Sequence, residues 1–491
     1  MISSVSSFKY DDDEPLSDQQ FAKLGGNGHP SDSEIEEAIK LNLRLKRKIV
    51  QSSSFNPQTF PMLVSLAVDN LKSQNKAPLD LVCVLDHSGS MNGEKMKLVK
   101  NTFTVLLKYL GDFDRLSIVI FDDKASRLVP LIRTTELNKK KIMSAIRSVN
   151  GDGGTDINLG MMHAFQVLQQ RRYINPITSI FLLSDGLDAG AHQRVKKSLA
   201  DFHIQDDITI NTFGFGSDHD PKLMSEVSDL RDGNFYFVEQ LDTVDEAFVD
   251  CLGGLLSAVG QNVTIRIKPE QSEILKGVEI VKAYGDVAMW AREGDTYITK
   301  ITNLMSGRQK DFVLELKIPV NNRELRDHER NPAVASAEAN LIGIDGKKIA
   351  KKAYLDITLL NEIEEFKDEE EDDREVMKNF YRLKGASVMD EARKLADEKK
   401  NDNAKKLLES FKEELQHSFL KSEQFIQNLI KDIDQAIQNV NPVVYNVVGR
   451  HGMYENVRAQ YYQKSNLKSA NCYQNSVQTD MLNSVRFMKK K

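Results

Sequence analysis

The sequence contains little cysteine: three residues in a chain of 491, at Cys83, Cys251 and Cys472. They lie far apart and form no CxxC pair, so their spacing predicts neither a zinc site nor a disulfide framework. Cys83 lies inside an apolar run and is expected to be a small core residue. Such sparing use of cysteine is typical of a reducing compartment, and we therefore expect the protein in the cytoplasm.

Other features that the sequence lacks narrow the class of partner. Residues 1–18, MISSVSSFKYDDDEPLSD, hold neither the basic segment nor the apolar run that forms a secretory signal. No apolar run elsewhere approaches the length that crosses a bilayer. The formal net charge is −6, whereas proteins that bind nucleic acids or membrane surfaces need a basic face. We therefore expect neither nucleic acid nor membrane among the partners.

The sequence does contain the apolar and charged residues of a globular protein, at 40% and 28%. A chain of this length exceeds one ordinary hydrophobic core, so two or three domains are expected. Changes in composition and periodicity divide it further. The expected segments are a disordered N-terminal segment (1–45), a leading strand and polar hinge (46–78), an α/β domain (79–259), an all-β domain (260–361), an acidic linker with a helical bundle (362–442) and a polar, partly irregular C-terminal tail (443–491).

The α/β domain is predicted from alternating strand and helix patterns. Short apolar runs are separated by segments whose apolar residues recur with helical spacing. Such alternation is typical of a Rossmann-like, doubly wound parallel sheet with helices on both faces, in which ligands bind beyond the carboxyl ends of the strands. The run 125–132 contains Pro130, which indicates an edge strand. The apolar strands are expected at 79–86, 115–122, 178–185 and 208–216.

The pattern changes after residue 260, where strand-like segments follow one another without a long helix between them. A small β-sandwich is therefore expected, followed by a C-terminal helical region. Within that region, residues 404–419 and 425–440 carry apolar stripes at helical spacing, which predicts helices that pack into a bundle. Residues 392–411 are similar to a single tetratricopeptide unit, although one such unit more often packs than binds a peptide.

Polar oxygens gather where three loops of the expected sheet meet. Asp86, Ser88 and Ser90 follow the strand 79–86, Thr155 follows two glycines, and Asp185 ends the strand 178–185. Two carboxylates and three hydroxyls form an oxygen-only set, which suits Mg²⁺ or Mn²⁺, with Ca²⁺ less favoured. The alternative for each motif alone is structural, because Asp86 and Ser88 can cap the following helix and Ser-Asp-Gly is an ordinary turn. All three motifs at one sheet edge favour the metal site.

The three motifs, DxSxS at 86–90, GGTD at 153–156 and SDG at 184–186, closely resemble the metal-ion-dependent adhesion site of von Willebrand factor type A (VWA) domains. The resemblance covers roughly residues 79–259. It implies that Ser88 and Ser90 bind the metal directly and that Thr155 binds it directly or through water. Asp86 and Asp185 would act directly or through water and hold the shell. In this family the ion often keeps one position open for an acidic residue of a partner protein.

The later part of the chain is similar to intracellular VWA proteins related to plant ubiquitin ligases, which carry a RING finger ahead of the VWA domain. The segment NCYQNSVQTDMLNSVRF (471–487) carries this resemblance. A RING finger needs two full sets of zinc ligands, mostly cysteine, and this chain has three cysteines in all. Any ligase activity would therefore come from a partner.

We thus expect a metal-dependent protein-interaction module and not an enzyme. One alternative is a scaffold or adaptor, of the ubiquitin pathway for example, that binds through its helical C-terminal region. A remote alternative is a metal-dependent hydrolase, which needs a base beside the ion. His87 and Asp156 are the candidates, but His87 is expected to point away from the metal and Asp156 to orient its loop or cap a helix. The chain contains no GxSxG, P-loop or HExxH motif.

Overall fold

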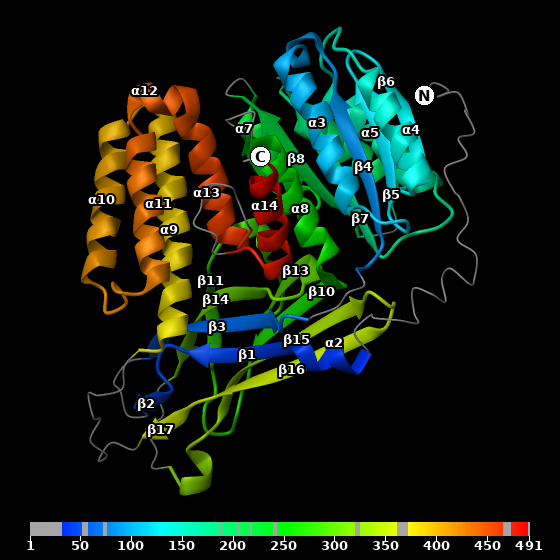
Figure 1. Cartoon of the computed structure of the whole chain (residues 1–491). Helices are drawn as coiled ribbons and strands as arrows, with labels where there is room; N and C mark the ends of the chain where they lie inside the picture. Colours follow the sequence, from blue (N-terminus) through cyan, green and yellow to red (C-terminus); the bar gives the residue numbers. More distant parts are fainter. Residues whose placement is uncertain are drawn as a thin grey trace. The chain divides into compact units, whose positions relative to one another are not determined.

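The computed structural model describes residues 32–51, 57–71, 76–185, 188–204, 207–216, 219–238, 243–319, 325–360, 372–464 and 473–489. The chain forms two compact units. The first contains Ser73–Ala258 together with Val477–Lys491, and the second contains Pro30–Lys72 together with Val259–Ser476 (Figure 1). Most of the segment predicted to be disordered, and the acidic run at 361–371, lie outside the described residues.

The first unit is built on a six-stranded sheet with the order β6-β5-β4-β7-β8-β9. All neighbouring strands are parallel except β5 and β6. The Pro130-containing strand β6 lies at the edge of the sheet, as the sequence predicted, and it pairs antiparallel with β5. The Rossmann-like α/β fold is thus confirmed. The strands are β4 (Leu79–Asp86), β5 (Arg115–Phe121), β6 (Ala125–Arg133), β7 (Ile177–Ser184), β8 (Thr209–Phe215) and β9 (Phe235–Val238).

Helices cover this sheet through large apolar contacts. Phe248 of α8 packs edge-on against Phe181 of β7, with ring centroids 5.6 Å apart, and also contacts Phe103 of α3. Gly160 lets α5 approach β5 closely, because a Cβ at this position would lie 2.6 Å from the Phe121 ring. The helices are α3 (Glu94–Tyr109), α4 (Glu136–Arg147), α5 (Ile157–Gln170), α6 (Ala191–Asp201), α7 (Pro221–Asp229) and α8 (Val244–Leu256).

The described part of the C-terminal segment is largely helical, whereas the sequence predicted no helix in this polar, partly irregular tail. Residues 450–489 contain α13 (Arg450–Tyr462) and α14 (Ser476–Lys489), and α14 lies beside α8 (Figure 1). Gln478 Nε2 donates to the Asp250 carbonyl oxygen at 3.0 Å, and Arg486 Nε donates to Glu246 at 2.8 Å. The prediction failed because α14 buries only a narrow apolar stripe within a mostly polar segment. The buried residues of α14 are Gln478, Met481, Leu482 and Val485.

The second unit contains the predicted β-region, but its first strands come from earlier in the chain. One sheet has the order β1-β3-β14-β11 and the other has the order β12-β13-β10-β15-β16. The parallel pair β2 and β17 is separate, and a short helix, α2 (Asp32–Ala38), precedes β1. The strands are β1 (Ile39–Leu45), β2 (Ile49–Gln51), β3 (Gln58–Val68), β10 (Ala258–Pro269), β11 (Glu279–Ala283), β12 (Ala291–Glu293), β13 (Thr296–Met305), β14 (Gln309–Ile318), β15 (Ala333–Gly343), β16 (Lys348–Asp356) and β17 (Thr358–Leu360).

This arrangement corrects two predicted boundaries. The predicted disordered segment 1–45 includes α2 and β1, and the predicted leader of the α/β domain includes β3, which pairs with β1 and β14 in the second unit. Ser65 Oγ donates to Asp311 Oδ1 at 2.5 Å across 246 residues of sequence. Pairing over such a distance depends on the whole fold, so the local pattern could predict the strand but not its partner.

The helical region and the β-region belong to the same compact unit, although each has its own hydrophobic core. The predicted stripes are confirmed in α10 (Asn401–His417) and α11 (Gln424–Asn439), which bury Leu408 and Ile433 among others. The preceding helix, α9 (Arg374–Asp397), packs Leu383 against Val313 of β14. Arg382 is fully buried and donates to the carbonyl oxygens of Asp311, at 2.8 Å, and Gln460. A short α12 (Pro442–Val444) and a π-turn at Tyr445–Gly449 connect α11 to α13.

Among the described residues, no helix is long and apolar enough to cross a membrane. The longest helix of the unit just described, α9, carries charged residues along its length.

Stability of the second unit is expected to depend on the protonation of Asp432. Burial raises the pKa of this carboxyl to about 6, although Gln460 Nε2 donates to it at 2.8 Å. Because the folded-state pKa lies above the unfolded one, the folded state binds the proton more tightly, and stability falls as the pH rises from about 4 to 6. Asp432→Asn keeps an acceptor for Gln460, so at pH 7–8 it should raise the free energy of unfolding by at most about 3 kcal/mol.

Urea unfolding followed by the fluorescence of Trp290, which lies in the same unit, measures this effect. The difference between wild type and Asp432→Asn should shrink toward zero below pH 4. A difference that does not change with pH would contradict the assignment, because it would reflect packing and not charge.

Candidate functional site

The first part of the site is the turn that follows β4. Asp86 ends the strand and is fully buried. Ser184 Oγ donates to Asp86 Oδ2 at 2.6 Å, and the Ser88 amide donates to Oδ1 at 2.9 Å. Burial raises the pKa of Asp86, and these hydrogen bonds oppose the shift in part. Both carboxylate oxygens of Asp86 are thus held by hydrogen bonds.

The hydroxyls after Asp86 converge on the carboxylate that follows β7. Ser88 Oγ and Ser90 Oγ lie 3.1 Å apart, and Ser90 Oγ donates to Asp185 Oδ1 at 2.9 Å. Asp185 is only 3% exposed. The strands β4 and β7 are neighbours in the sheet, which explains why side chains 95 residues apart meet here. Four of the predicted residues, Asp86, Ser88, Ser90 and Asp185, therefore form one connected cluster.

The loop that carries Thr155 is bound to the same turn through its main chain. The Gly89 amide donates to Gly153 O at 3.2 Å, and the Asp152 amide donates to His87 O at 2.8 Å. Gly153 has φ +80°, a left-handed conformation that favours glycine. Thr155 itself is half-buried beside these contacts. The structure thus brings the loop of the fifth predicted residue against the turn that holds Ser88 and Ser90.

Asp156 caps the next helix, as the sequence suggested, because its side chain accepts a hydrogen bond from the Leu159 amide at 3.1 Å. His87 directs its ring toward Asp122, with 3.4 Å between Nε2 and Oδ2. Asp188 accepts a hydrogen bond from the Ile157 amide at 2.9 Å and pairs with Arg194. It fixes the start of α5 through a contact between residues 31 positions apart.

Sequence reasoning missed three residues that shape the site. Lys95, in the first turn of α3, forms an ion pair with Asp185. Asp123 accepts a hydrogen bond from the Gly154 amide at 2.9 Å and so holds the Thr155 loop. Ser184, which donates to Asp86, lies in the SDG motif, but the sequence assigned a role only to Asp185 of that motif. Nothing in the sequence marks Lys95, because a lysine near a helix start is ordinary.

The residues of the cluster fit a hard divalent cation. Its donors are carboxylates and hydroxyls only, which is the chemistry that Mg²⁺ and Mn²⁺ prefer. Among the described residues no group of three or more His, Cys, Asp and Glu could hold a metal, so the hydroxyls must supply part of any shell. The Lys95 ammonium already pairs with the buried Asp185 carboxylate, so a metal ion at this carboxylate would replace one cation by another.

Comparison with known proteins agrees with the fold. Residues 80–249 match the family model of the von Willebrand factor type A domain, and this part of the chain is a VWA domain. Domains of this class typically mediate protein–protein interactions, and they commonly bind a divalent metal at their adhesion site. The match lies entirely within the first unit of the structure.

Proteins of plants and bacteria are among the curated relatives. The E3 ubiquitin-protein ligase WAV3 of Arabidopsis thaliana is 29% identical over 250 residues, which are 51% of this chain and 32% of WAV3. The uncharacterized protein YfbK of Escherichia coli is 25% identical over 251 residues, which are 49% of this chain and 43% of YfbK. The chain thus spans less than half the length of these relatives.

Two solved structures share the fold over most of the chain. A von Willebrand factor type A protein from Catenulispora acidiphila aligns with a TM-score of 0.61 and 13% identity, covering 89% of this chain and all of that one. The ArnB paralog VWA2 from Sulfolobus acidocaldarius aligns with a TM-score of 0.54 and 14% identity, covering 86% of this chain and 98% of that one. At such identity the likeness shows the fold alone.

Proposed function

We propose that the chain is a metal-dependent protein-interaction module. Asp86, Ser88, Ser90, Thr155 and Asp185 would hold Mg²⁺ or Mn²⁺, and a carboxylate from a protein partner would complete the shell. The observation that carries the proposal is the contact of Ser88, Ser90 and Asp185 within hydrogen-bond distance at the carboxyl edge of the sheet. A bound cation would supply a strong, directional attraction for one carboxylate of the partner.

The chain's own residues have distinct roles in this proposal. Asp86 is oriented by Ser184 and the Ser88 amide, so its charge is fixed behind the serine hydroxyls. Ser90 and Lys95 both contact Asp185. A metal at the serines therefore competes with the Lys95 ammonium for the same carboxylate, and Lys95 would move away from Asp185 when the metal binds.

Replacing Lys95 by methionine should strengthen Mg²⁺ binding by about three- to tenfold, because it removes a positive charge beside a cation site. Calorimetric titration of Mg²⁺ into the full chain measures the change. Lys97→Met, on the same helix and paired with the exposed Glu94, is the matched control and should leave the affinity within about twofold. Unchanged or weaker binding in Lys95→Met would show that the ammonium does not oppose the metal.

An adaptor role in the ubiquitin pathway is a second candidate, since relatives such as WAV3 are named E3 ubiquitin-protein ligases. The chain matches only part of those proteins, and the role proposed here is to present a bound partner. A hydrolase is less well supported, because the candidate bases His87 and Asp156 are engaged by Asp122 and by the start of α5.

Affinity capture with the full chain separates the candidates. Partners that bind in Mg²⁺, are released by EDTA and do not bind the Ser88→Ala/Ser90→Ala variant would support the metal-dependent module. Partners retained equally in EDTA and by the variant would contradict it, because their binding would not depend on the metal.

A further inference from the structure

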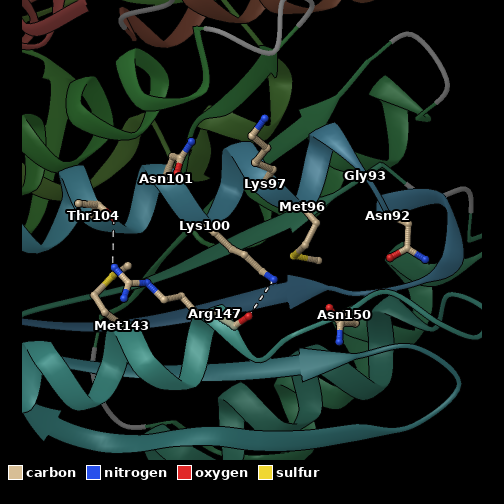
Figure 2. Close-up of a pocket in the computed structure, with 10 residues that line it drawn as sticks. All are labelled: Asn92, Gly93, Met96, Lys97, Lys100, Asn101, Thr104, Met143, Arg147 and Asn150. Carbon is tan, nitrogen blue, oxygen red and sulfur yellow. Dashed lines mark hydrogen bonds between the residues drawn. The ribbon is translucent and has the colours of Figure 1, made fainter.

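A basic groove lies between α3 and α4 in the VWA domain. Its first part is a cavity of about 360 Å³, with Lys97, Lys100 and Arg147 among its lining residues (Figure 2). The second part is a cavity of about 570 Å³ that shares Thr104, Met143 and Arg147 with the first. Because they share these residues, the two cavities adjoin, and we call them together the α3–α4 groove.

Positive charge dominates the α3–α4 groove, although the whole chain has a net charge of −6. Glu136 is the acidic residue of its lining, and Lys139 pairs with it at 2.9 Å. Arg147 and Lys140 are exposed, and no carboxylate among the described residues pairs with either. The basic residues of the lining are Lys97, Lys100, Lys108, Lys139, Lys140 and Arg147. An anionic ligand would therefore find unneutralised cations here.

The end of the groove at the start of α3 adjoins the loops of the proposed metal site. Asn92 follows Ser90 closely in sequence and lines the groove. Its side chain accepts from the Gly151 amide at 2.8 Å and donates to Gly151 O at 2.7 Å. Asn150, the residue before Gly151, lines the same cavity. A chain bound at the metal could thus continue directly into the groove.

The length of the groove favours an extended peptide over a small anion. Its lining on α3 runs from Gly93 to Lys108, about 22 Å at the rise of an α-helix. That distance matches about seven residues of extended chain. Met96 and Met143 add apolar surface that the methylene groups of acidic side chains can contact.

We propose that the α3–α4 groove binds an acidic, extended segment of the protein partner whose carboxylate completes the metal shell. The inference rests on the proposed function for the identity of that partner, but the groove charges act without the metal. Glutamate and aspartate residues next to the metal-bound carboxylate would lie against Lys100, Lys140 and Arg147. The groove would then select partners by a run of acidic residues, while the metal selects one carboxylate.

The test uses the full chain and a fluorescein-labelled heptaglutamate peptide, with binding followed by fluorescence anisotropy in Mg²⁺ and in EDTA. Lys140→Gln/Arg147→Gln should weaken binding about five- to tenfold in both conditions. The matched control is Lys196→Gln/Lys197→Gln, which removes the same charge from exposed positions on α6, and it should change the affinity less than about twofold. Calorimetry should show that the groove variant binds Mg²⁺ like the wild type.

Several results would overturn the inference. Equal weakening by both double variants would show non-specific attraction. Tighter binding of tripolyphosphate than of heptaglutamate, lost in the groove variant, would identify a phosphate site. Tighter peptide binding after Asp368→Asn/Glu369→Gln/Glu370→Gln/Glu371→Gln would identify the chain's own acidic run as the occupant. A different result bears only on the proposed function. If the wild type does not bind Mg²⁺, the metal site is contradicted, and the comparison in EDTA still tests the groove.

Discussion

Mg²⁺ is expected to stabilise the wild-type chain and to lose this effect when Ser88 and Ser90 are both replaced by alanine. A ligand that binds only the folded state raises the free energy of unfolding, by about 2 kcal/mol at a free concentration roughly twenty times its Kd. The two hydroxyls lie 3.1 Å apart, and Ser90 contacts Asp185. Removing both hydroxyls takes away the ligands between the carboxylates, so the gain should fall to zero.

Hydrogen exchange of β4 and β7 in Mg²⁺ and in EDTA measures this stabilisation locally. Ser126→Ala/Ser148→Ala is the matched control, because it removes two exposed serine hydroxyls of the same domain that do not belong to the cluster. The control should keep the full response to Mg²⁺. An equal response in the Ser88→Ala/Ser90→Ala variant would show that the metal binds elsewhere.

Asp80→Ala should destabilise the VWA domain by about 3–5 kcal/mol, because it leaves two buried guanidinium groups without their carboxylate. Asp80 is fully buried on β4. Arg115 donates to both of its oxygens, at 2.7 Å and 2.6 Å, and Arg171 donates to Oδ2 at 2.6 Å. Both arginines are themselves almost fully buried. The cluster joins β4, β5 and the end of α5 at the edge opposite the metal site.

Hydrogen exchange of peptides from β4, β5 and β7 tests this prediction, since the only tryptophan, Trp290, lies in the other unit. Asp112→Ala is the control, because Asp112 is exposed on the neighbouring turn and should change stability by less than about 0.5 kcal/mol. If Asp80→Ala lowered the free energy of unfolding by less than about 1 kcal/mol, the prediction would be wrong, and water would have to reach the arginines and replace the carboxylate.

Most of the site was predictable because its residues are marked locally. Asp86 and Asp185 each end an apolar run, and parallel strands bring such ends to one edge. Ser88 and Ser90 follow at short spacing from the first of them. These signals need no knowledge of distant contacts. The family resemblance then assigned each residue a role, and the structure places Asp86, Ser88, Ser90 and Asp185 in contact.

The rest of the fold depends on partners that are distant in sequence. The VWA sheet could be predicted from its alternating elements, but β3 gives no local sign that it pairs with β14. The apolar stripe of α14 does not reveal that this helix packs against α8. The roles of Lys95 and Asp80 could not be predicted for the same reason, because each side chain contacts a residue more than 30 positions away in the sequence. Local pattern predicts elements, whereas these contacts arise only when the elements assemble.

The most direct test of the central claim is a calorimetric titration of Mg²⁺ into the metal-free full chain. If the metal site exists, the wild type should bind one Mg²⁺ ion per chain saturably, and Asp86→Ala and Ser88→Ala/Ser90→Ala should not bind it. The titration is repeated with heptaglutamate present, because the peptide offers the carboxylate that a partner would supply. The absence of saturable binding by the wild type, both with and without the peptide, would contradict the account.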